Sequence, residues 1–572
     1  MNTIETLDTV PFKHLIMTIG ELPTSYVESM TYYEMLAWLC NYVQTKVIPA
    51  VNNNAEAVEE IQEWIETLDL QDEVDHKLDE MAGDGTLAEI INQEIFGELN
   101  EQVTQNKNNI SDLQTAISNL PTDEANITKL IKYNQYTTQP LRGGKLTLPS
   151  AFNAFQGNLY RDADGKIYDD LDLSKYDTNN IMYVDYDNGD DSTGSHIEPD
   201  THPFKTVKGA LTYINNLASG NNFKIICKTY RFARDEFYNS DTATREYVTS
   251  RSVVIEPYDP AKTIVVSCDQ RGLSWTRSGI LWTTSRSNVG YVYRLGKQDG
   301  FGMFDKLTEV STLEECQDTA NTWYQSGSSL YLHTIGNEEP TFDKYMITLK
   351  LSVVHFNIQN NRYLRLKNID FYPYYGIQFK NTGSSYENAL ICENVRIFGQ
   401  NDDNGFTVSN VKTVIMKNCS TAENYADGFN YHFPNMASEI SSTIVYENGC
   451  KASRNGLTYD RDICNASTIH EGANIIRVNG VYQTSKGPII ADINSCNTYM
   501  NHCLINQTLN KKAIEFEDET GAEGTGRAYL VDCQCLQTQT LSIEGTNDFN
   551  VQLKNFKGNY ENDNLNISLY NE

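Results

Sequence analysis

The sequence predicts a mainly β protein in which stacked coils of parallel strands follow an α-helical start. Three observations favour this fold class. The composition changes near residue 121, and the spacing of apolar residues before it is helical. After residue 180 the chain consists of short alternating strands separated by Gly, Asn and Asp turns. In this second part a strand that ends in asparagine recurs at intervals of 24 to 30 residues, and such a period is typical of stacked repeats.

Residues 1–85 are predicted to form a helical region. Thr31 and Glu34 fit a capping box at the start of one helix. Apolar residues then recur at three- and four-residue intervals; they are Val58, Ile61, Ile65, Leu68, Leu70, Val74, Leu78 and Met81. This spacing indicates helices with one apolar face.

A short coiled coil is predicted for residues 86–121. A second capping box, Thr86 with Glu89, begins it, and Pro121 ends it. The seam alternates by four and three residues through Leu99, Val103, Asn106, Ile110, Leu113, Ile117 and Leu120. Its one polar member, Asn106, can fix register and oligomer number, and its apolar members favour a dimer. A single amphipathic helix packed on its own domain is the alternative.

Residues 122–180 are predicted to be a linker or neck, and residues 181–572 to form a parallel β-helix. The repeated strands read LRLKN, LICEN, VIMKN, IVYEN and VQLKN, and their asparagines are Asn368, Asn394, Asn418, Asn448 and Asn555. We expect the first four asparagines to lie near one edge of the stacked coils.

Glycine marks a second corner, eight to eleven residues after each of the first four asparagines, where positive φ is expected. Alternate residues of a strand share a face. The predicted core residues beyond this corner are Ile377, Phe379, Phe406, Val408, Phe429, Tyr431, Leu457 and Tyr459. Their neighbours form an outward column, with members about 4.8 Å apart: Lys380, Ser409, His432 and Asp460.

Acidic and basic residues gather between about 423 and 492, where a sugar or polyol-phosphate chain would meet them in turn. An imidazole beside a carboxylate can orient a proton carrier. The predicted catalytic residues are Asp427, His432, Asp460, His470 and Glu471. The predicted substrate-binding residues are Lys380, Asn404, Asn430, Asn455, Arg477 and Asp492. Surface ion pairs and a structural asparagine ladder are the alternative interpretation.

Composition excludes several classes of function. The chain has 572 residues and a formal net charge of -31, which repels nucleic acid and anionic membranes. It contains no run of 18 apolar residues, and the start MNTIETLDTVPFKH lacks the regions of a signal peptide. We expect a protein made in the cytoplasm that binds no nucleic acid and inserts into no membrane.

The sequence predicts no metal and no cofactor. The twelve cysteines are scattered without a disulfide framework, and we interpret them as buried thiols. Cys533 and Cys535 share one strand face, but no further cysteine or histidine pair accompanies them. An acidic turn contains Asp185, Asp187, Asp190 and Asp191, and a solvated loop is favoured there over a calcium site. It precedes an amphipathic helix expected within 203–217, with Val207, Ala210, Leu211 and Ile214 on its apolar face.

Several segments resemble known families. PFKTVKGAL, which follows an acidic YVD turn, and the Asn-closed strands resemble the pectate-lyase-like right-handed parallel β-helix. The start of the chain resembles the attachment region of tail fibre or appendage proteins from short-tailed phages of Gram-positive bacteria; the segments are PFKHLIMTIGELPTSYVESMTYYEMLAWL and WIETLDLQDEVDHKLDEM. DGFNYH and STIHEGANIIRVNGVYQTSKGPIIAD resemble segments of phage pectate-lyase-like tail proteins.

The resemblance implies a tail fibre or tailspike of the virion, made in the host cytoplasm. Such a protein attaches the virion to a host cell-wall polymer, either wall teichoic acid or a glycan, and some of them cleave it. It docks to phage tail or collar proteins through its N-terminal region. The resemblance implies a homotrimer, whereas the heptad favours a dimer.

Three functions stay open at this point. A structural adhesin would bind the polymer unchanged, a depolymerase would release soluble fragments from it, and a cellular polysaccharide lyase or hydrolase is least favoured because it needs no coiled coil. A glycosidase requires two suitably spaced carboxylates. A phosphodiester-cleaving enzyme requires a proton acceptor and a donor, for which His432 with Asp460 or His470 with Glu471 would serve.

Overall fold

The computed structural model describes residues 143–217, 222–237, 246–350, 354–457, 463–509, 512–517, 526–537, 542–545, 549–558 and 565–570. The chain divides into two compact units, Met1–Tyr133 and Asn134–Glu572. The predicted helical region and coiled coil lie outside the described residues and stay predictions.

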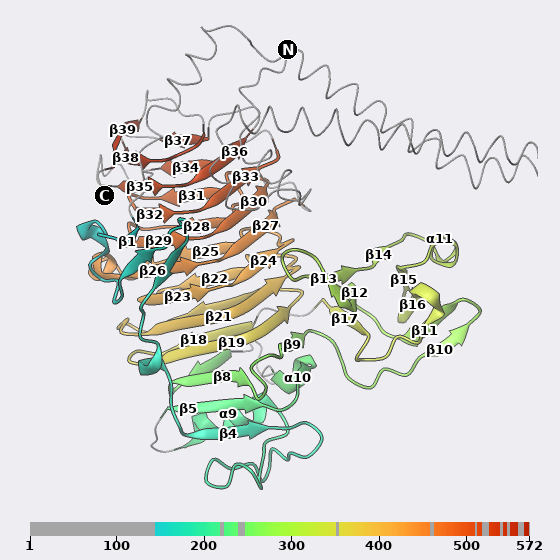
Figure 1. The fold of residues 1–572 in the computed structure, drawn as a ribbon. Helices are drawn as coiled ribbons and strands as arrows, with labels where there is room; N and C mark the ends of the chain where they lie inside the picture. Colours follow the sequence, from blue (N-terminus) through green and yellow to red (C-terminus); the bar gives the residue numbers. More distant parts are fainter. Residues whose placement is uncertain are drawn as a thin grey trace, which may run out of the picture. The chain divides into compact units, whose positions relative to one another are not determined.

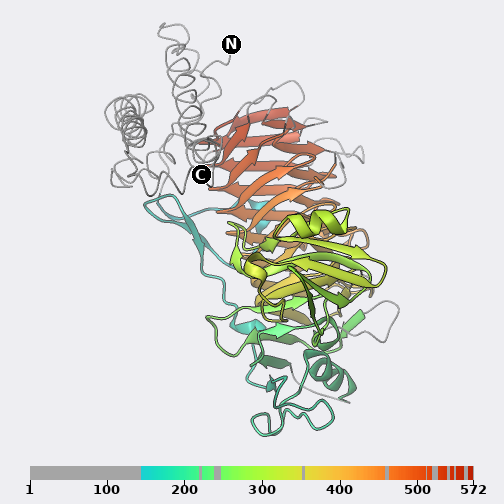
Figure 2. The same cartoon turned by 90° about the vertical axis from the view of Figure 1, so that its right-hand side faces the viewer.

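The described part of the second unit is mainly β, and its strands follow one another in successive coils (Figures 1 and 2). A complete coil visits three faces, here called A, B and C, and these faces together form the coil stack. Each strand pairs in parallel with its equivalent in the coils before and after it. These long parallel sheets are compatible with the predicted parallel β-helix.

The strands of the coil stack have the following bounds. Face A contains β4 (Ile181–Val184), β5 (Phe223–Cys227), β8 (Val253–Pro257), β23 (Thr413–Lys417), β26 (Ile444–Asn448), β29 (Asn474–Val478), β32 (Asn497–Asn501), β35 (Arg527–Val531), β38 (Phe549–Lys554) and β39 (Leu565–Leu569). Face B contains β6 (Arg231–Phe232), β9 (Ile264–Ser267), β24 (Ser420–Ala422), β27 (Lys451–Asn455), β30 (Val481–Ser485), β33 (Leu504–Gln507) and β36 (Gln534–Gln537). Two long strands, β19 (Tyr363–Tyr372) and β21 (Ala389–Phe398), run across faces A and B. Face C contains β7 (Glu246–Thr249), β18 (Val354–Ile358), β20 (Ile377–Lys380), β22 (Phe406–Ser409), β25 (Phe429–His432), β28 (Ser467–Ile469), β31 (Ile490–Ile493), β34 (Ile514–Glu517) and β37 (Ile543–Gly545).

The corner between faces A and B is one residue in the left-handed region. Asn368, Asn394 and Asn418 take this position with φ of 53°, 54° and 53°, which asparagine tolerates better than most residues. In later coils the same position has positive φ at Gly449, Asn479, His502, Asp532 and Asn555. The predicted asparagine edge is therefore present, although Asn448 lies one residue before its corner.

The corner between faces B and C needs glycine for a different reason than predicted. The expectation of positive φ is wrong for Gly405 and Gly428, which do not adopt it. A Cβ atom on Gly428 would lie 2.4 Å from the carbonyl oxygen of Ala466. Glycine is required because the backbone of the next coil leaves no room for a side chain.

The interior of the coil stack is a continuous apolar core. Six predicted core residues are 0% exposed: Ile377, Phe379, Phe406, Val408, Phe429 and Tyr431. The rings of Phe379, Phe406 and Phe429 stack from coil to coil, with centroids 6.4 and 5.0 Å apart. Leu457 was predicted to be core and is instead 37% exposed, while Tyr459 lies outside the described residues.

The predicted helix is α9 (Val207–Asn216), and its four predicted apolar residues are buried. The Thr206 side chain caps it by accepting the N–H of Gly209 at 2.9 Å. Asp191 accepts the N–H groups of Lys205 and Thr206, each at 2.9 Å. This aspartate of the acidic turn therefore orders the start of the helix.

Residues 143–176, here called the strap, pack on the outside of face A. They contain the antiparallel strands β1 (Gly144–Lys145), β2 (Leu159–Arg161) and β3 (Ile167–Asp169), and the 3-10 helices η4 (Ser150–Phe152) and η5 (Ser174–Tyr176). Apolar strap residues, including Phe152 and Phe155, contact Tyr446 and Tyr499 of face A. Part of the sequence assigned to the linker or neck thus covers one face of the coils.

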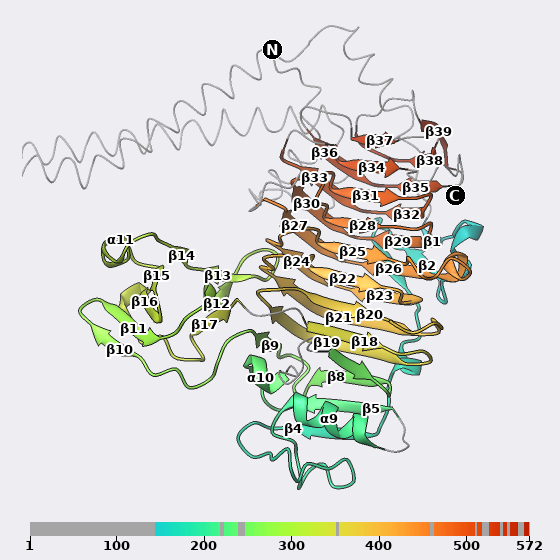
Figure 3. The same cartoon turned by 180° about the vertical axis from the view of Figure 1, so that it is seen from behind.

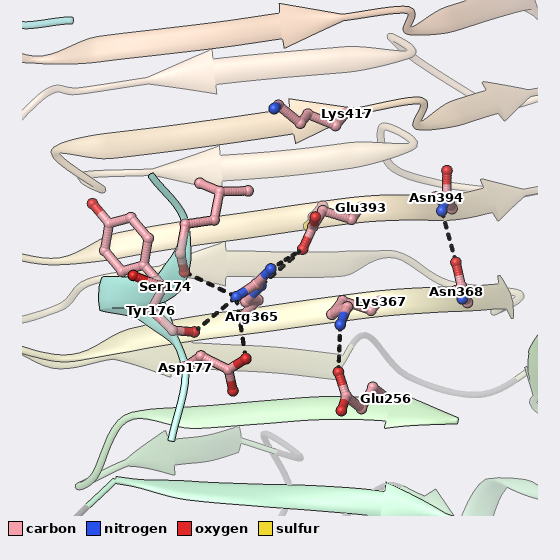
Figure 4. A network of polar contacts seen from close by, with 12 residues as sticks. Ser174, Tyr176, Asp177, Glu256, Arg365, Lys367, Asn368, Glu393, Asn394 and Lys417 are labelled. Carbon is pink, nitrogen blue, oxygen red and sulfur yellow. Dashed lines mark hydrogen bonds and ion pairs between the residues drawn. The ribbon is translucent and has the colours of Figure 1, made fainter. Parts of the chain in front are cut away.

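Polar contacts fix the strap in place (Figure 4). Arg365 of β19 donates from Nη1 to the carbonyl oxygens of Leu173 and Tyr176 at 3.0 and 3.3 Å, and from Nε to Glu393 at 2.8 Å. At the end of β3, the Asp169 carboxylate accepts three hydrogen bonds; the donors are Lys417 at 2.7 Å, Tyr446 at 2.8 Å and Asn448 at 3.0 Å.

Replacing Asp169 by asparagine is expected to lower the free energy of unfolding by about 2–3 kcal/mol at pH 7. Burial alone would raise the pKa of this carboxyl, but hydrogen bonds from Lys417, Tyr446 and Asn448 hold it below its ordinary value. A carboxyl whose folded pKa is depressed stabilises the protein above its unfolded pKa of about 3.9, and this is lost as the pH falls through the folded pKa. The difference between the two proteins should therefore shrink below about pH 4.

Denaturant titrations at pH 7 and pH 3 measure this difference. Asp164→Asn is the matched control, because Asp164 is an exposed aspartate of the same strap. Equal losses of unfolding free energy in the two variants would contradict the stabilising role of the Asp169 carboxylate. A loss in Asp169→Asn that does not change with pH would contradict it as well.

An insert, residues 270–350, separates β9 from β18 and was not predicted from the sequence. Its elements are β10 (Thr276–Ser278), β11 (Leu281–Ser285), β12 (Val289–Gln298), β13 (Phe304–Lys306), β14 (Thr308–Glu309), α11 (Leu313–Asp318), β15 (Thr322–Ser326), β16 (Ser329–His333), η6 (Ile335–Asn337) and β17 (Tyr345–Leu349). They form two largely antiparallel sheets around a separate apolar core beside the coils (Figure 3). The ion pair of Arg454 with Asp299, at 2.7 Å, links the stack to the insert.

Two short helices complete the described elements: α10 (Arg234–Phe237) and η7 (Ile440–Ser442). The eleven cysteines in the described ranges are free thiols and buried, as the sequence predicted. Among the described residues, no helix has the length and apolar character needed to span a membrane.

Candidate functional site

The outward side of face C carries a column of polar side chains, one per coil. Backbone pairing aligns Lys380 with Ser409, and Ser409 with His432, as the sequence predicted. The next coil adds His470, which follows the pair of Tyr431 with Ile469 in register. Neighbouring members stand on strands about 4.8 Å apart. Each of the four is partly exposed, so the column is accessible from solvent.

The prediction that Asp460 follows His432 in this column is wrong. The strand beside β25 is β28, because the N–H of Phe429 donates to the carbonyl oxygen of Ala466 at 2.9 Å. The Asn455–Gly456 pair, which resembled the corner of the next coil, ends β27 on face B instead. Asp460 itself lies outside the described residues.

His432, His470 and Glu471 meet in one cluster at this column. The Nδ1 atom of His432 lies 3.3 Å from Oε1 of Glu471, and the two imidazole rings stack with centroids 3.9 Å apart. The other oxygen of Glu471 accepts the N–H of Phe433 at 2.6 Å. Nε2 of His470 lies 3.2 Å from Oγ1 of Thr468. The structure therefore brings three of the five predicted catalytic residues together.

The backbone turns sharply at this cluster. Glu471 has a φ of 61° and Gly472 a φ of 77°. A glutamate in the left-handed region costs free energy, and such residues concentrate at functional sites and tight turns. The turn directs the Glu471 carboxylate back to the histidine of the preceding coil.

Burial and neighbouring groups shift the pKa values of His470 and Glu471. Burial, followed by the proximity of His432, lowers the pKa of His470 to about 4. Burial alone would raise the pKa of Glu471, but hydrogen bonds from His432 and from the Phe433 N–H hold it below its ordinary value. At neutral pH the cluster therefore contains a carboxylate and an uncharged imidazole.

Asp427, a predicted catalytic residue, belongs to the corner between faces B and C. Its Oδ1 accepts the N–H of Asn465 at 2.7 Å, and its Oδ2 accepts Nδ2 of Asn430 at 2.6 Å. Its own N–H donates to Oδ1 of Asn404 at 2.8 Å. These contacts connect three successive coils, so Asp427, Asn404 and Asn430 hold the corner together beside the cluster.

Three predicted substrate-binding residues lie where a surface polymer cannot reach them. Arg477, Asp492 and Asn455 are each 0% exposed. Arg477 donates from Nη1 and Nη2 to the two oxygens of Asp492, each at 2.8 Å. Burial alone would lower the pKa of Arg477, but Asp492 and Glu447 raise it above its usual range. The assignment of these three residues to substrate binding is corrected. Arg477 and Asp492 form an ion pair inside the coil stack, and Oδ1 of Asn455 accepts a hydrogen bond from Nδ2 of Asn424 at 2.9 Å.

Glu447 joins this buried ion pair and was missed in the sequence. It is 0% exposed and accepts hydrogen bonds from Tyr431 at 2.8 Å, from Ser467 at 2.9 Å, and from Tyr482. The signal was present in the strand IVYEN, because Glu447 shares the inward parity of Val445. Tyr431 and Ser467 precede His432 and His470 by one and three residues, so the buried network lies directly beneath the cluster.

Comparisons with known proteins do not identify the function. No known protein family and no curated protein matches the chain. A solved structure described as "Glycoside hydrolase" is similar with a TM-score of 0.39 and 9% sequence identity, over 68% of this chain and 95% of that chain. A likeness this weak carries no argument, so the function is argued from the site.

Proposed function

We propose that this chain is a receptor-binding tail fibre or tailspike of a phage, and that its coil stack binds a host cell-wall polymer along face C. The observation that carries the proposal is the column Lys380, Ser409, His432 and His470, which offers one polar side chain per coil. A linear polymer laid across the strands meets these groups at intervals of about 4.8 Å. Repeated weak polar contacts of this kind suit a glycan or a teichoic acid.

The segments that resemble phage tail proteins support the attachment role. DGFNYH contains His432, and STIHEGANIIRVNGVYQTSKGPIIAD contains His470 and Glu471. The segments with the most specific resemblance therefore supply the cluster. In this proposal the N-terminal region docks to tail or collar proteins, and the chain assembles as a homotrimer in the virion.

Charge narrows the class of polymer. The chain has a formal net charge of -31, and Arg477 cannot offset it at the surface because it is buried and paired with Asp492. The basic residue types of the column are Lys380, His432 and His470, and all three are partly exposed. The proposed polymer is therefore uncharged, or carries amines that balance its phosphates.

Adsorption to purified cell walls tests the binding proposal. Cell walls from a panel of Gram-positive bacteria are mixed with the protein, and a wall that the protein binds should deplete it from solution. Chemical removal of teichoic acid from that wall then shows whether the bound polymer is teichoic acid or a glycan. His432→Ala should weaken adsorption about tenfold, equivalent to about 1.4 kcal/mol. His502→Ala is the matched control, because the His502 side chain is 38% exposed and pairs with Asp532 at 2.8 Å, compared with 37% for His432.

Three outcomes of this experiment decide the binding proposal. Weaker adsorption of His432→Ala alone supports it. Equal adsorption of the two variants, or no adsorption of the parent protein to any wall, contradicts it.

The cluster favours a second candidate function, cleavage of the bound polymer. His432, His470 and Glu471 place two imidazoles and a carboxylate at one point of the column, and such groups can accept and donate a proton during the cleavage of an ester or phosphodiester. A two-carboxylate glycosidase is less favoured. Asp427, the other predicted catalytic carboxylate among the described residues, already accepts hydrogen bonds from Asn465 and Asn430 at the corner.

Release of soluble phosphate-containing fragments from the bound wall tests cleavage. The parent protein should release them, and His432→Ala should reduce the rate by about 100-fold or more, because proton transfer contributes factors of this size. His502→Ala should release fragments at the parental rate. A parent protein that adsorbs and releases nothing would reject cleavage and leave the adhesin.

A further inference from the structure

We propose that His432, His470 and Glu471 form a binding site for a divalent ion of the zinc class. Imidazole and carboxylate are ligands that Zn²⁺ and neighbouring first-row ions accept. One donor atom from each of the three residues lies within 4.8 Å of the other two. Within the part of the chain that the structure describes, no other group of three such residues meets this condition.

The distance between two of the donors suits a shared ion. Zinc bonds of 2.0–2.1 Å in tetrahedral geometry separate the ligand atoms by roughly 3.3–3.4 Å. Nδ1 of His432 lies 3.3 Å from Oε1 of Glu471. These two atoms therefore already have the spacing that an ion bound between them requires.

Surrounding contacts hold the ligands as a metal site needs. Metal-binding histidines commonly use their second nitrogen in an outer hydrogen bond, and bound carboxylates are themselves hydrogen-bonded. Nε2 of His470 lies 3.2 Å from Oγ1 of Thr468, which leaves Nδ1 for an ion. Oε2 of Glu471 accepts the Phe433 N–H at 2.6 Å, which leaves Oε1. His470 and Glu471 thus each keep one atom that can bind a metal ion.

The imidazole planes have to turn for an ion to bind. The rings of His432 and His470 are 17° from parallel and stack face to face, whereas a bound ion lies in the plane of each ring. The torsion that turns an imidazole is broad, so this rotation meets no steep barrier of its own. The His432 side chain is 37% exposed, which leaves its ring room to move.

The arrangement fits the pattern of catalytic rather than structural zinc sites. Structural sites are closed by four protein ligands, whereas catalytic sites use three and keep one position open. Here the three ligands stand in the outward column of face C, so the open position faces the surface that the polymer would contact. Sequence spacing predicted no metal, because His432 and His470 come from different coils. The proposed ion binding holds whether or not the chain binds a polymer.

Isothermal titration of the full-length protein with ZnCl₂, after dialysis against a chelator, tests the site. We expect one saturable site per chain, with an affinity at least tenfold lower in His432→Ala, His470→Ala and Glu471→Ala. The control His502→Ala should bind as the parent does, because His502 and Asp532 form a similar pair without a third donor. Co²⁺ in place of Zn²⁺ should give visible absorption bands in the parent that are lost in the three variants.

Two results would overturn the proposal. One is a parent protein without a saturable zinc site at one ion per chain. The other is unchanged zinc affinity in His432→Ala and Glu471→Ala variants that melt at the parental temperature. Circular dichroism of each variant shows whether it is folded, so that lost zinc binding can be assigned to the missing side chain and not to unfolding.

Discussion

Replacing Asp492 by leucine is expected to lower the free energy of unfolding by about 3–5 kcal/mol, because it leaves a buried charge without its partner. Arg477 is 0% exposed and donates two hydrogen bonds of 2.8 Å to Asp492. The nearest remaining carboxylate oxygen, on Glu447, lies 4.0 Å from its Nε, which is too far for a hydrogen bond. Guanidinium titration followed by circular dichroism measures the loss.

The double variant Arg477→Met with Asp492→Leu distinguishes charge from packing. A buried ion pair can often be replaced by apolar residues of similar size at little cost. We therefore expect the double variant to regain much of the stability that Asp492→Leu loses, with a coupling energy above about 1 kcal/mol. A single variant that loses less than about 1 kcal/mol would show that water or another group solvates Arg477, which would contradict the structure.

Replacing Gly428 by alanine is the second substitution with a large expected effect, about 3 kcal/mol of destabilisation. The added Cβ atom would lie 2.4 Å from the carbonyl oxygen of Ala466 and 2.9 Å from Cβ of Ala452. Neither of these two atoms can move without its backbone, and a third close atom, Nδ2 of Asn455 at 2.8 Å, belongs to a side chain that is 0% exposed. The coils must therefore separate. The same movement weakens the hydrogen bond of 2.8 Å from the Gly428 N–H to Asn465.

Gly300→Ala is the control for this prediction. A Cβ atom on Gly300 meets no atom within 4 Å, and its φ is not in the left-handed region. Its denaturation midpoint should equal that of the parent or slightly exceed it, because alanine reduces the entropy of the unfolded chain. Equal midpoints for the two variants would contradict the close approach of coils at Gly428.

The coil arrangement could be predicted because one local rule repeats along the chain. From Asn368 to Asn555, the face A segment of each coil is followed by a residue with positive φ, and asparagine marks it in the first three of these coils at Asn368, Asn394 and Asn418. The insert shows no such signal. Most of its strands are as short as those of the coils but pair antiparallel, and strand length alone cannot distinguish the two arrangements.

The neighbour of His432 could not be predicted, because loop length varies between coils. Seven positions separate Ala422 from Phe429, whereas twelve separate Asn455 from Ser467 in the next coil. The Asn455–Gly456 motif resembled the corner before face C, so the sequence alignment placed Asp460 beside His432. Asn455 instead ends β27 on face B, and the face C strand of this coil is β28. Only the backbone pairing of Tyr431 with Ile469 sets His470 beside His432.

Arg477 and Asp492 were misassigned although the alternation rule applied to both. Arg477 shares a strand face with Ile475, and Asp492 shares one with Ile490, and both isoleucines are in the core. The rule therefore indicates inward side chains, but a charged residue suggests a surface. The inward position is stable here because each charge has its partner on an adjacent face of the same coil.

The most direct test of polymer binding along face C is an adsorption isotherm with the column blocked in its middle. Ser409→Arg adds a long side chain between Lys380 and His432, while Ser278→Arg makes the same change at an exposed position of the insert. With walls that the parent protein binds, we predict at least tenfold weaker adsorption for Ser409→Arg and parental adsorption for Ser278→Arg. Parental adsorption of a folded Ser409→Arg variant would contradict the placement of the binding surface on face C.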